Sequence, residues 1–476
     1  FIRSFLKGNT MSDFRIEKDS LGEVRVPADA WYAAQTQRAH NNFPISGIRF
    51  PRRFIEALGT IKLASARANH ALGILDENVM NAIVHASEQV RTGAYDDEFV
   101  LDIFQTGSGT SSNMNANEVI SNLATVANGG KKGEKLIHPN DHVNMSQSSN
   151  DVIPTAMHVS AAVALKTELL PALESFKMEL AAKSAEFDDI LKSGRTHLMD
   201  ATPVRLGQEF GGYAAQISSC IKRVHVALEE LSQLALGGTA TGTGINCPAG
   251  FSTSAIGFIN TLTGITFLEA DNHFEAQASK DAFVQASGTL NTIAVALMKI
   301  VNDIRHMSSG PSSGLAEIQL PAIQPGSSIM PGKVNPVMSE AVMMVCAKVM
   351  GNHVTITTGG QHGNFELNVM MPVMAHAMLE SIAILSGSMN AFRTNCLTGI
   401  TADRERCREL LELNPSIATA LNRSIGYDLA SKVAKASATQ KKSVRQVVLE
   451  MNIMDEKTLN EVLDVRHMTE PGIPGQ

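Results

Sequence analysis

Apolar residues recur at helical spacing through most of the chain, and they predict long amphipathic helices rather than a sheet. In residues 165–187, Leu and Phe return at steps of three, four or seven, which places them on one helix face. Comparable runs cover residues 205–236, 281–307, 335–351 and 367–397, and shorter ones cover 51–73 and 76–93. Residues 14–50 lack this pattern and are expected to be rich in loops.

Prolines and capping residues refine where the predicted helices begin and bend. The helix that begins near Asp151 contains Pro154, which fits a first turn, and Pro171, which is expected to kink it. Ser443 and Gln446 have the spacing of a capping box and predict the start of a short helix. Helices as long as the central ones carry more apolar surface than one chain can cover, so we expect a bundle shared between copies.

The pattern divides the chain into three mainly α-helical domains. They are an N-terminal domain over residues 11–147, a central long-helix bundle over 148–403 and a small C-terminal helical domain over 404–476. Residues 1–10 are mildly basic and precede Met11, so we expect a non-native or disordered extension.

Composition narrows the possible partners and the compartment. The net charge of −7 over 476 residues argues against a nucleic-acid partner, which would need a basic surface. The five cysteines have no paired spacing, which indicates a reduced chain without disulfides. The most apolar candidate for a membrane span, residues 367–385, contains Pro372, His376 and Glu380, so no membrane segment is expected. A cytoplasmic protein is therefore expected, or one of the mitochondrial matrix if the source is eukaryotic.

Several polar loops between the helical runs could bind an anion. The loop of residues 326–336 combines two hydroxyls, one ammonium group and one amide just before a helix start, although a plain Gly/Pro linker with a serine cap has the same composition. A phosphate-binding P-loop would need Gly at Ser327 and a hydroxyl at Val334. His138 and His142 have no carboxylates at metal-ligand spacing. We therefore expect neither a cofactor nor a metal.

Five polar segments resemble motifs of the fumarase/aspartase superfamily, and the likeness extends over nearly all of the chain from Met11 onward. They read GSGTSSNMN at 107–115, SQSSND at 146–151, GRTHLMD at 194–200, GSSIMPGKVNP at 326–336 and GNFELN at 363–368. Gly332 before Lys333 and His197 after Thr196 resemble the class II fumarases, since aspartate ammonia-lyases carry Ala and Gln at these places.

The resemblance implies a three-domain fold in which the central helices of four chains form the core of a homotetramer. It also implies reversible hydration of fumarate to L-malate in the tricarboxylic acid cycle, by acid/base catalysis through an enediolate and without a cofactor. Each active site would take its motifs from three different subunits.

Roles for individual residues follow from the same resemblance. Ser327 would be the base, His197 the acid acting through a water, and Glu340 the partner of His197, although Glu340 could simply face solvent. The resemblance implies substrate contacts for Ser108, Gly109, Thr110, Ser148, Ser149, Asn150, Thr196, Ser328, Lys333, Val334 and Asn335. A second dicarboxylate site would contain His138, Pro139, Asn140 and Asp141, unless these form only a polar turn; beside them stands His142, where many relatives carry Asp.

The residue types suit this chemistry. Removing a proton next to a carboxylate requires a cation and oriented donors around that carboxylate, and it requires that water be excluded. Lys333 and Asn335 supply a charge and an amide from one loop. A serine acts as a base only if neighbouring N–H groups and cations stabilise its deprotonated form.

Other functions remain as alternatives at this level. An aspartate ammonia-lyase, or a lyase acting on a succinyl adduct, would use a similar scaffold. A non-catalytic relative, like the lens crystallins of this superfamily, would be expected to lack Ser327, Lys333 or His197, and all three are present. A helical scaffold that only binds partners would leave the polar loops unexplained.

Overall fold

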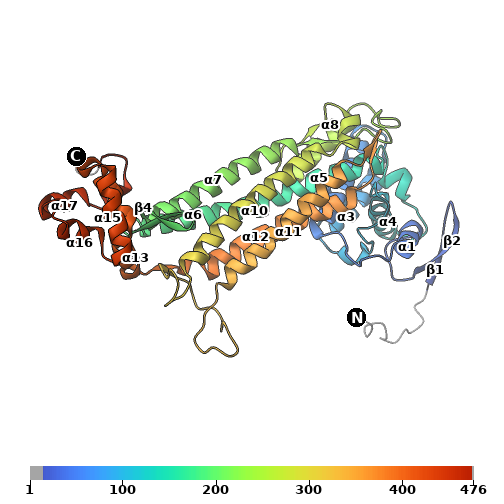
Figure 1. Ribbon diagram of the computed structural model, residues 1–476. Helices are drawn as coiled ribbons and strands as arrows, with labels where there is room; N and C mark the ends of the chain where they lie inside the picture. The colour runs from blue at the N-terminus through green and yellow to red at the C-terminus, as the bar shows by residue number, and fades with distance from the viewer. Residues whose placement is uncertain (1–13, 474–476) are drawn as a thin grey trace. The chain divides into compact units, whose positions relative to one another are not determined.

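The computed structural model describes residues 14–473, and most of them lie in helices (Figure 1). The chain divides into two compact units. Unit 1 contains Phe1–Pro171, Lys222–Thr292 and Ala347–Leu385, and unit 2 contains Ala172–Ile221, Ile293–Cys346 and Ser386–Gln476. The divisions fall within long helices or at their ends. The predicted boundaries of three domains remain a prediction, and the expectation for residues 1–10 lies outside the described residues.

The long helices confirm the hydrophobic periodicity, although the helix predicted over residues 335–351 continues to Gly360. They are α7 (Leu206–Glu230), α10 (Asp281–Met307), α11 (Val337–Gly360) and α12 (Met371–Asn395). A fifth helical stretch consists of α5 (Ser149–Ala164), the π-turn η3 (Leu165–Leu169) and α6 (Leu170–Glu186). The wide π-turn ends two residues before Pro171, which lacks the N–H needed to continue the regular hydrogen-bond ladder.

The expected position of Pro154 was wrong. It lies inside α5 rather than in the first turn, because Ser148 and Asp151 form a capping box that starts the helix earlier. The backbone N–H of Ser148 donates to Asp151 Oδ1 at 2.9 Å, and Ser148 Oγ accepts from the N–H of Asn150 at 3.2 Å.

Unit 1 also contains helices α2 (Arg52–Ala71), α3 (Glu77–Arg91), α4 (Thr110–Ala127), α8 (Phe251–Thr263) and α9 (His273–Ala278). Both α2 and α3 were predicted, and α2 packs against α3, α4, α5 and α8. Near them lie the 3₁₀ turn η1 (Asp96–Glu98), the π-turn η2 (Pro139–Val143), the parallel pair β5 (Gln233–Leu234) and β6 (Leu268–Glu269), and the hairpin of β8 (Gly363–Asn364) and β9 (Leu367–Asn368).

The loop expected over residues 14–50 was largely wrong. The segment forms an antiparallel hairpin, β1 (Phe14–Asp19) with β2 (Gly22–Pro27), followed by helix α1 (Ala34–Asn42). Arg15 holds the end of the hairpin, since its guanidinium donates to the carbonyl oxygens of Pro27, Ala30 and Tyr32. Most residues of both strands are at least partly exposed, and Phe14 and Ile16, like Val24 and Val26, alternate with charged residues, a strand signal that the sequence interpretation missed.

Unit 2 contains two small antiparallel pairs and the C-terminal helices. The pairs are β3 (Leu191–Thr196) with β4 (Met199–Arg205) and β7 (Ile318–Gln319) with β10 (Thr401–Ala402). The helices at the end of the chain share a core that includes Leu421, Val433 and Val448. They are α13 (Arg404–Glu412), α14 (Asn422–Ile425), α15 (Tyr427–Gln440), α16 (Val444–Glu450) and α17 (Glu456–Val462), with 3₁₀ turns η4 (Leu397–Gly399), η5 (Pro415–Leu421) and η6 (His467–Thr469). The predicted capping box of Ser443 and Gln446 starts α16.

One helix corrects the view that no segment is apolar enough to span a membrane. Among the described residues, α10 has the length and the composition to do so, with a mean hydropathy of 1.3. However, 56% of that apolar window is buried inside the protein itself. Its apolar character therefore fits a core helix.

The five cysteines form no disulfide, and four of them are buried. Burial raises the pKa of the Cys346 thiol to about 11 and those of Cys396 and Cys407 to about 12. Burial also raises the pKa of Cys247, which is less covered, to about 11.

Candidate functional site

The loop of residues 326–336 is closed on itself by hydrogen bonds. The N–H of Gly326 donates to the Lys333 carbonyl oxygen at 2.8 Å, and Asn335 Nδ2 donates to the Gly326 carbonyl oxygen at 2.6 Å. A Cβ at Gly326 would lie 2.3 Å from that Lys333 oxygen, so the loop can close only with glycine there. Asn335 thus supports the loop from inside.

Ser327 lies at the centre of this loop. Its Oγ accepts hydrogen bonds from the backbone N–H groups of Ile329 at 3.2 Å and Met330 at 3.0 Å. Ser328, Lys333 and Val334 beside it are exposed. Two N–H donors on one hydroxyl oxygen favour a negative charge there, as the chemistry of a serine base requires. The same contacts would occur in a simple serine turn.

Thr196 and His197 lie at the tip of the β3–β4 hairpin. The register pairs Thr196 with Met199, so His197 and Leu198 form a two-residue turn, with φ of 56° and 59°. Positive φ at both turn residues is typical of a type I′ hairpin. The imidazole of His197 is consequently presented at an exposed corner.

Buried charges hold the strand that leads to this tip. Arg195 donates to both carboxylate oxygens of Glu317 at 2.9 Å, and Glu317 is completely buried. Lys192, also buried, lies 3.3 Å from Glu317 and 2.9 Å from Glu209. Removing one member of such a cluster leaves an uncompensated charge, which costs about 3–5 kcal/mol. The cluster therefore fixes the segment before the tip.

The three predicted catalytic residues all belong to unit 2, but they do not interact with one another within a single chain. In the described part, residues 14–473, no hydrogen bond or ion pair links His197, Ser327 and Glu340. Glu340 lies exposed in the first turn of α11, and Lys333 is exposed as well. The predicted pairing of Glu340 with His197 therefore stays a prediction.

Unit 1 contains two of the predicted substrate-binding groups, and helix α4 connects them. Gly109 caps α4 with φ of 72°, and Ser108 Oγ lies 2.8 Å from Thr110 Oγ1. Further along the same helix, Asn113 Nδ2 donates to Ser149 Oγ at 2.9 Å. The two serine- and threonine-bearing segments are thereby attached to one rigid element.

The second group, residues 148–150, begins α5. Asn150 Nδ2 donates to the Ala240 carbonyl oxygen at 2.8 Å. Asp151, which is fully buried, accepts from the N–H groups of Gly237 and Thr239 at 3.0 and 2.9 Å. Burial raises the pKa of Asp151, although these N–H groups act in the opposite direction.

The amides and the lysine behind Ser149 were missed by the sequence interpretation. Asn113 is part of the matched segment 107–115 and could have been found there, whereas Lys62 lies within an ordinary helical run. Asn144 and Gln147 accept hydrogen bonds from Lys62 Nζ at 2.9 and 3.0 Å.

The predicted second dicarboxylate site forms a compact polar turn. His138 Nδ1 accepts from the N–H groups of Asn140 and Asp141 at 3.3 and 3.1 Å, and it starts the π-turn that contains the buried Pro139. The N–H of His138 donates to His142 Nδ1 at 2.9 Å. This geometry accounts for the turn by itself, and anion binding there stays a prediction.

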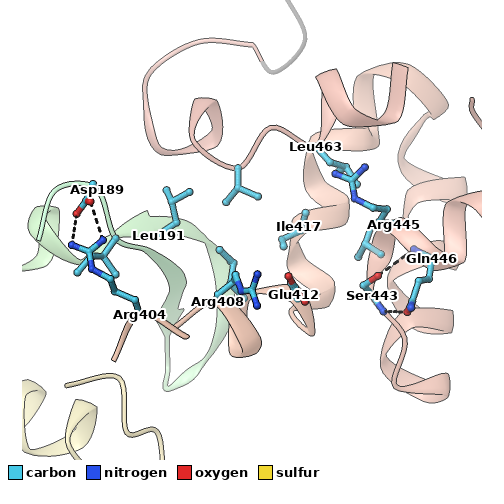
Figure 2. Close-up of a pocket in the computed structure, with 14 residues that line it drawn as sticks. Asp189, Leu191, Arg404, Arg408, Glu412, Ile417, Ser443, Arg445, Gln446 and Leu463 are labelled. Carbon is cyan, nitrogen blue, oxygen red and sulfur yellow. Dashed lines mark hydrogen bonds and ion pairs between the residues drawn. The ribbon is translucent and has the colours of Figure 1, made fainter. Parts of the chain in front are cut away.

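A cavity of about 570 Å³ in unit 2 contains none of the predicted site residues. Figure 2 shows Arg404 paired with Asp189 on one side and the Ser443–Gln446 capping box on the other. The two hydrogen bonds between Arg404 and Asp189 measure 2.8 and 3.0 Å. Ile417 and Leu463 contribute apolar walls. Arg404, Ser443 and Gln446 thus already have partners, which does not suit an acid/base centre. No cluster of three or more metal-ligating side chains occurs among residues 14–473.

Comparisons with known proteins agree over nearly the full length. One family model, described as Lyase, matches residues 22–351, and another, described as Fumarase C C-terminus, matches residues 417–470. The fumarate hydratase class II of Corynebacterium efficiens is 52% identical over 459 residues, 96% of each chain. The mitochondrial fumarate hydratase of Saccharomyces cerevisiae is 49% identical and covers 99% of this chain and 98% of its own.

The chain belongs to the class II fumarate hydratase family. The structure of a class II fumarase from Schistosoma mansoni agrees, with a TM-score of 0.94, 38% identity and coverage of 96% of this chain and 100% of that one. Membership in the class II fumarate hydratase family confirms the predicted mainly α fold class and the predicted enzyme class, a hydro-lyase. An aspartate ammonia-lyase is not favoured.

Proposed function

We propose that this enzyme interconverts fumarate and L-malate by reversible addition of water. The proposal is supported by relatives named fumarate hydratase at about half identity along the chain. Among the structural observations, the one that carries it is the pair of backbone N–H groups on Ser327 Oγ.

In the proposed mechanism, Ser327 takes a proton from the malate carbon next to one carboxylate. The two N–H groups on its oxygen and the ammonium of Lys333 on the same loop stabilise the deprotonated serine. The electron pair moves into the adjacent carboxylate as an enediolate. Lys333 also opposes the added negative charge on that carboxylate.

His197 then protonates the departing hydroxyl through a water, and the double bond of fumarate forms. Glu340 would orient the imidazole and stabilise its charged form. Neutral donors from Thr110, Ser149 and Asn150 would hold the substrate without cancelling its charge. The other predicted substrate contacts keep the roles that the resemblance implies.

A homotetramer in which three subunits share each site is part of the proposal. Helix α11 supports it, because exposed residues recur along one face at alternating steps of four and three. They are Met344, Ala347, Gly351, Val354 and Thr358, and Met344 and Val354 are 69% and 65% exposed in the single chain. Lys348, also exposed, borders this face and pairs with Glu380 at 2.8 Å. A face of apolar and small residues at this spacing fits the surface of another helix. The predicted cytoplasmic location also remains a proposal.

Absorbance of fumarate in the ultraviolet tests the reaction, with L-malate, L-aspartate or argininosuccinate supplied separately. We expect fumarate from L-malate alone. Ser327→Ala and His197→Asn should each lower kcat by at least about 100-fold, the scale of general acid/base catalysis. Formation of fumarate from L-aspartate but not from L-malate would refute the proposal.

Ser443→Ala is a matched control for Ser327→Ala. Ser443 Oγ also accepts a backbone N–H, at 3.2 Å, but it caps α16. This variant should lose about 1 kcal/mol of stability and retain kcat. An equal loss of kcat in both serine variants would mean that Ser327 is only a turn residue.

A further inference from the structure

Lys62 is a cation in the interior of unit 1 without a carboxylate bonded to it. It lies on α2, and its side chain is completely buried. Its Nζ donates to two neutral oxygens, Asn144 Oδ1 at 2.9 Å and Gln147 Oε1 at 3.0 Å, and it takes part in no ion pair within residues 14–473. A buried charge is costly unless it is compensated, so a role beyond packing is to be expected.

Lys62 and the Gln147 backbone carbonyl oxygen, which accepts from Asn144 Nδ2 at 3.1 Å, together fix which way the neighbouring amides point. An ammonium group only donates, so the atom of Asn144 that faces it must be the carbonyl oxygen. That oxygen also faces Asn113 Nδ2 at 3.3 Å and Asn117 Nδ2 at 3.2 Å. Both amides must therefore present their NH₂ groups to it.

The same constraint reaches Ser149. Asn113 Nδ2 uses one hydrogen toward Asn144 and the other toward Ser149 Oγ at 2.9 Å, so this serine oxygen must accept. Its own hydrogen is then left to donate elsewhere. Asn113 Oδ1 remains buried without a donor among the described residues, which costs about 1–3 kcal/mol. Without the constraint from Asn144, Asn113 would therefore not be expected to turn its NH₂ group toward Ser149.

We propose that Lys62 is a positioning residue that orients Ser149 as a hydrogen-bond donor toward a substrate carboxylate and adds a buried positive charge behind it. The inference rests on the proposed function, in which Ser149 contacts the dicarboxylate. Lys62 itself does not touch the substrate. Because it acts on binding, its loss should change KM much more than kcat.

The state of this charge depends on its surroundings. Burial lowers the pKa of Lys62 to about 7, and Asp151 on α5 opposes the change. From the other elements packed against α2, which are α3, α4, α8 and η2, no further charge acts on it in the described part of the chain. The ammonium form is therefore lost progressively as the pH rises through about 7.

Steady-state kinetics of the intact enzyme test the role of Lys62. Lys62→Met keeps the length of the side chain but removes its charge and donors. We expect KM for both fumarate and L-malate to rise about tenfold, equivalent to 1.4 kcal/mol, with kcat within about threefold. The KM of the wild-type enzyme should rise from pH 6 to pH 8.5 as Lys62 loses its proton. The part of this rise that Lys62 causes should be absent in Lys62→Met.

Lys280→Met is the matched control. Lys280 is almost as buried, and burial lowers its pKa to about 7 as well, but its Nζ donates to backbone carbonyls of Ala276, Gln277 and Ser279. This variant should shift stability and leave KM unchanged. If Lys62→Met does not assemble, Lys62→Gln serves as a second variant. Its polar side chain carries no charge and can present either an NH₂ group or an oxygen to Asn144, so the same rise in KM is expected.

Three results would overturn the inference. They are an unchanged KM in an assembled Lys62 variant, an equal rise of KM in Lys280→Met, and a decrease of kcat without a change in KM. A wild-type enzyme without activity on L-malate would instead refute the proposed function, so the two failures can be distinguished.

Discussion

Two histidines of this chain lie in opposite surroundings. His197 lies exposed at a hairpin tip, whereas His158 is buried in α5, where its Nδ1 donates to the Gln233 carbonyl oxygen at 2.8 Å. The ring of His158 stacks on Phe283 with centroids 6.2 Å apart. Burial lowers the pKa of His158 to about 4, and the charge of Lys280 adds to the effect. His158 is therefore neutral at ordinary pH and suits packing rather than proton transfer.

This pKa predicts a loss of stability in acid. Between pH 6.5 and about 4 the unfolded chain binds a proton that the folded chain does not, so stability falls as the pH decreases through this window. The difference of roughly 2.5 pH units corresponds to about 3 kcal/mol per chain. In His158→Gln, urea denaturation at pH 7, 5 and 4 should show a shallower decline. An unchanged decline would assign the acid sensitivity to other groups.

Sequence patterns pointed to the candidate site residues more readily than to the side chains that support them. Ser327, His197 and Lys333 lie in motifs that stand out as polar loops. Lys62 could not be recognised, because its partners Asn144 and Gln147 are distant in sequence and only folding brings them together. The members of a buried amide network do not recur at a regular spacing in the sequence, so no periodic pattern reveals them.

At the scale of elements, the β3–β4 turn combines strain with exposure. Left-handed backbone costs a residue with a side chain about 1–2 kcal/mol, and His197 and Leu198 both adopt it. The strain is tolerated because Arg195 and Glu317 anchor the adjoining strand. Strained turns often occur where a functional side chain must be presented.

Leu198→Gly should relieve part of this strain. Glycine adopts positive φ readily, so we expect a gain of about 1 kcal/mol in the free energy of unfolding, with kcat retained because His197 is unchanged. Leu198→Val, which is β-branched, should lose stability at the same position. Thermal and urea unfolding of the two variants would measure the difference, and an order opposite to this one would contradict the positive φ of the turn.

Helical elements were predicted where one face is apolar, and strands were not. The period of 3.6 residues located α10 with correct ends, since Asp281 begins it and Met307 closes it. Each strand of the β1–β2 hairpin alternates apolar and charged residues, which is a strand signal that the sequence interpretation missed. The pairing of Ile16 with Arg25 and of Val24 with Glu17 leaves neither face of the hairpin wholly apolar. Ser148 and Asp151 have the spacing of a capping box in the sequence and mark the start of α5, whereas Pro154 suggested a later start.

At the scale of the whole molecule, the exposed face of α11 predicts a dependence of activity on assembly. Met344→Asp combined with Val354→Asp places charges on that face, where they would be desolvated on association. We expect dissociation to smaller species in light scattering, together with loss of at least about 90% of the activity, since charge burial costs several kcal/mol.

Met451→Asp provides the control for this prediction. Met451 is 44% exposed just after α16, and its replacement should alter neither mass nor activity. An active monomer of the double variant would show that one chain holds a complete site.

The state of the cysteines has a consequence for redox chemistry. The thiolate is the form that reacts with peroxides and disulfides, and it is scarce at neutral pH when the pKa is near 11 or 12. Cys346, Cys396 and Cys407 are buried as well, so an oxidant reaches them only when the fold opens. The sulfur of these side chains thus adds apolar volume without making the native enzyme an oxidant sensor.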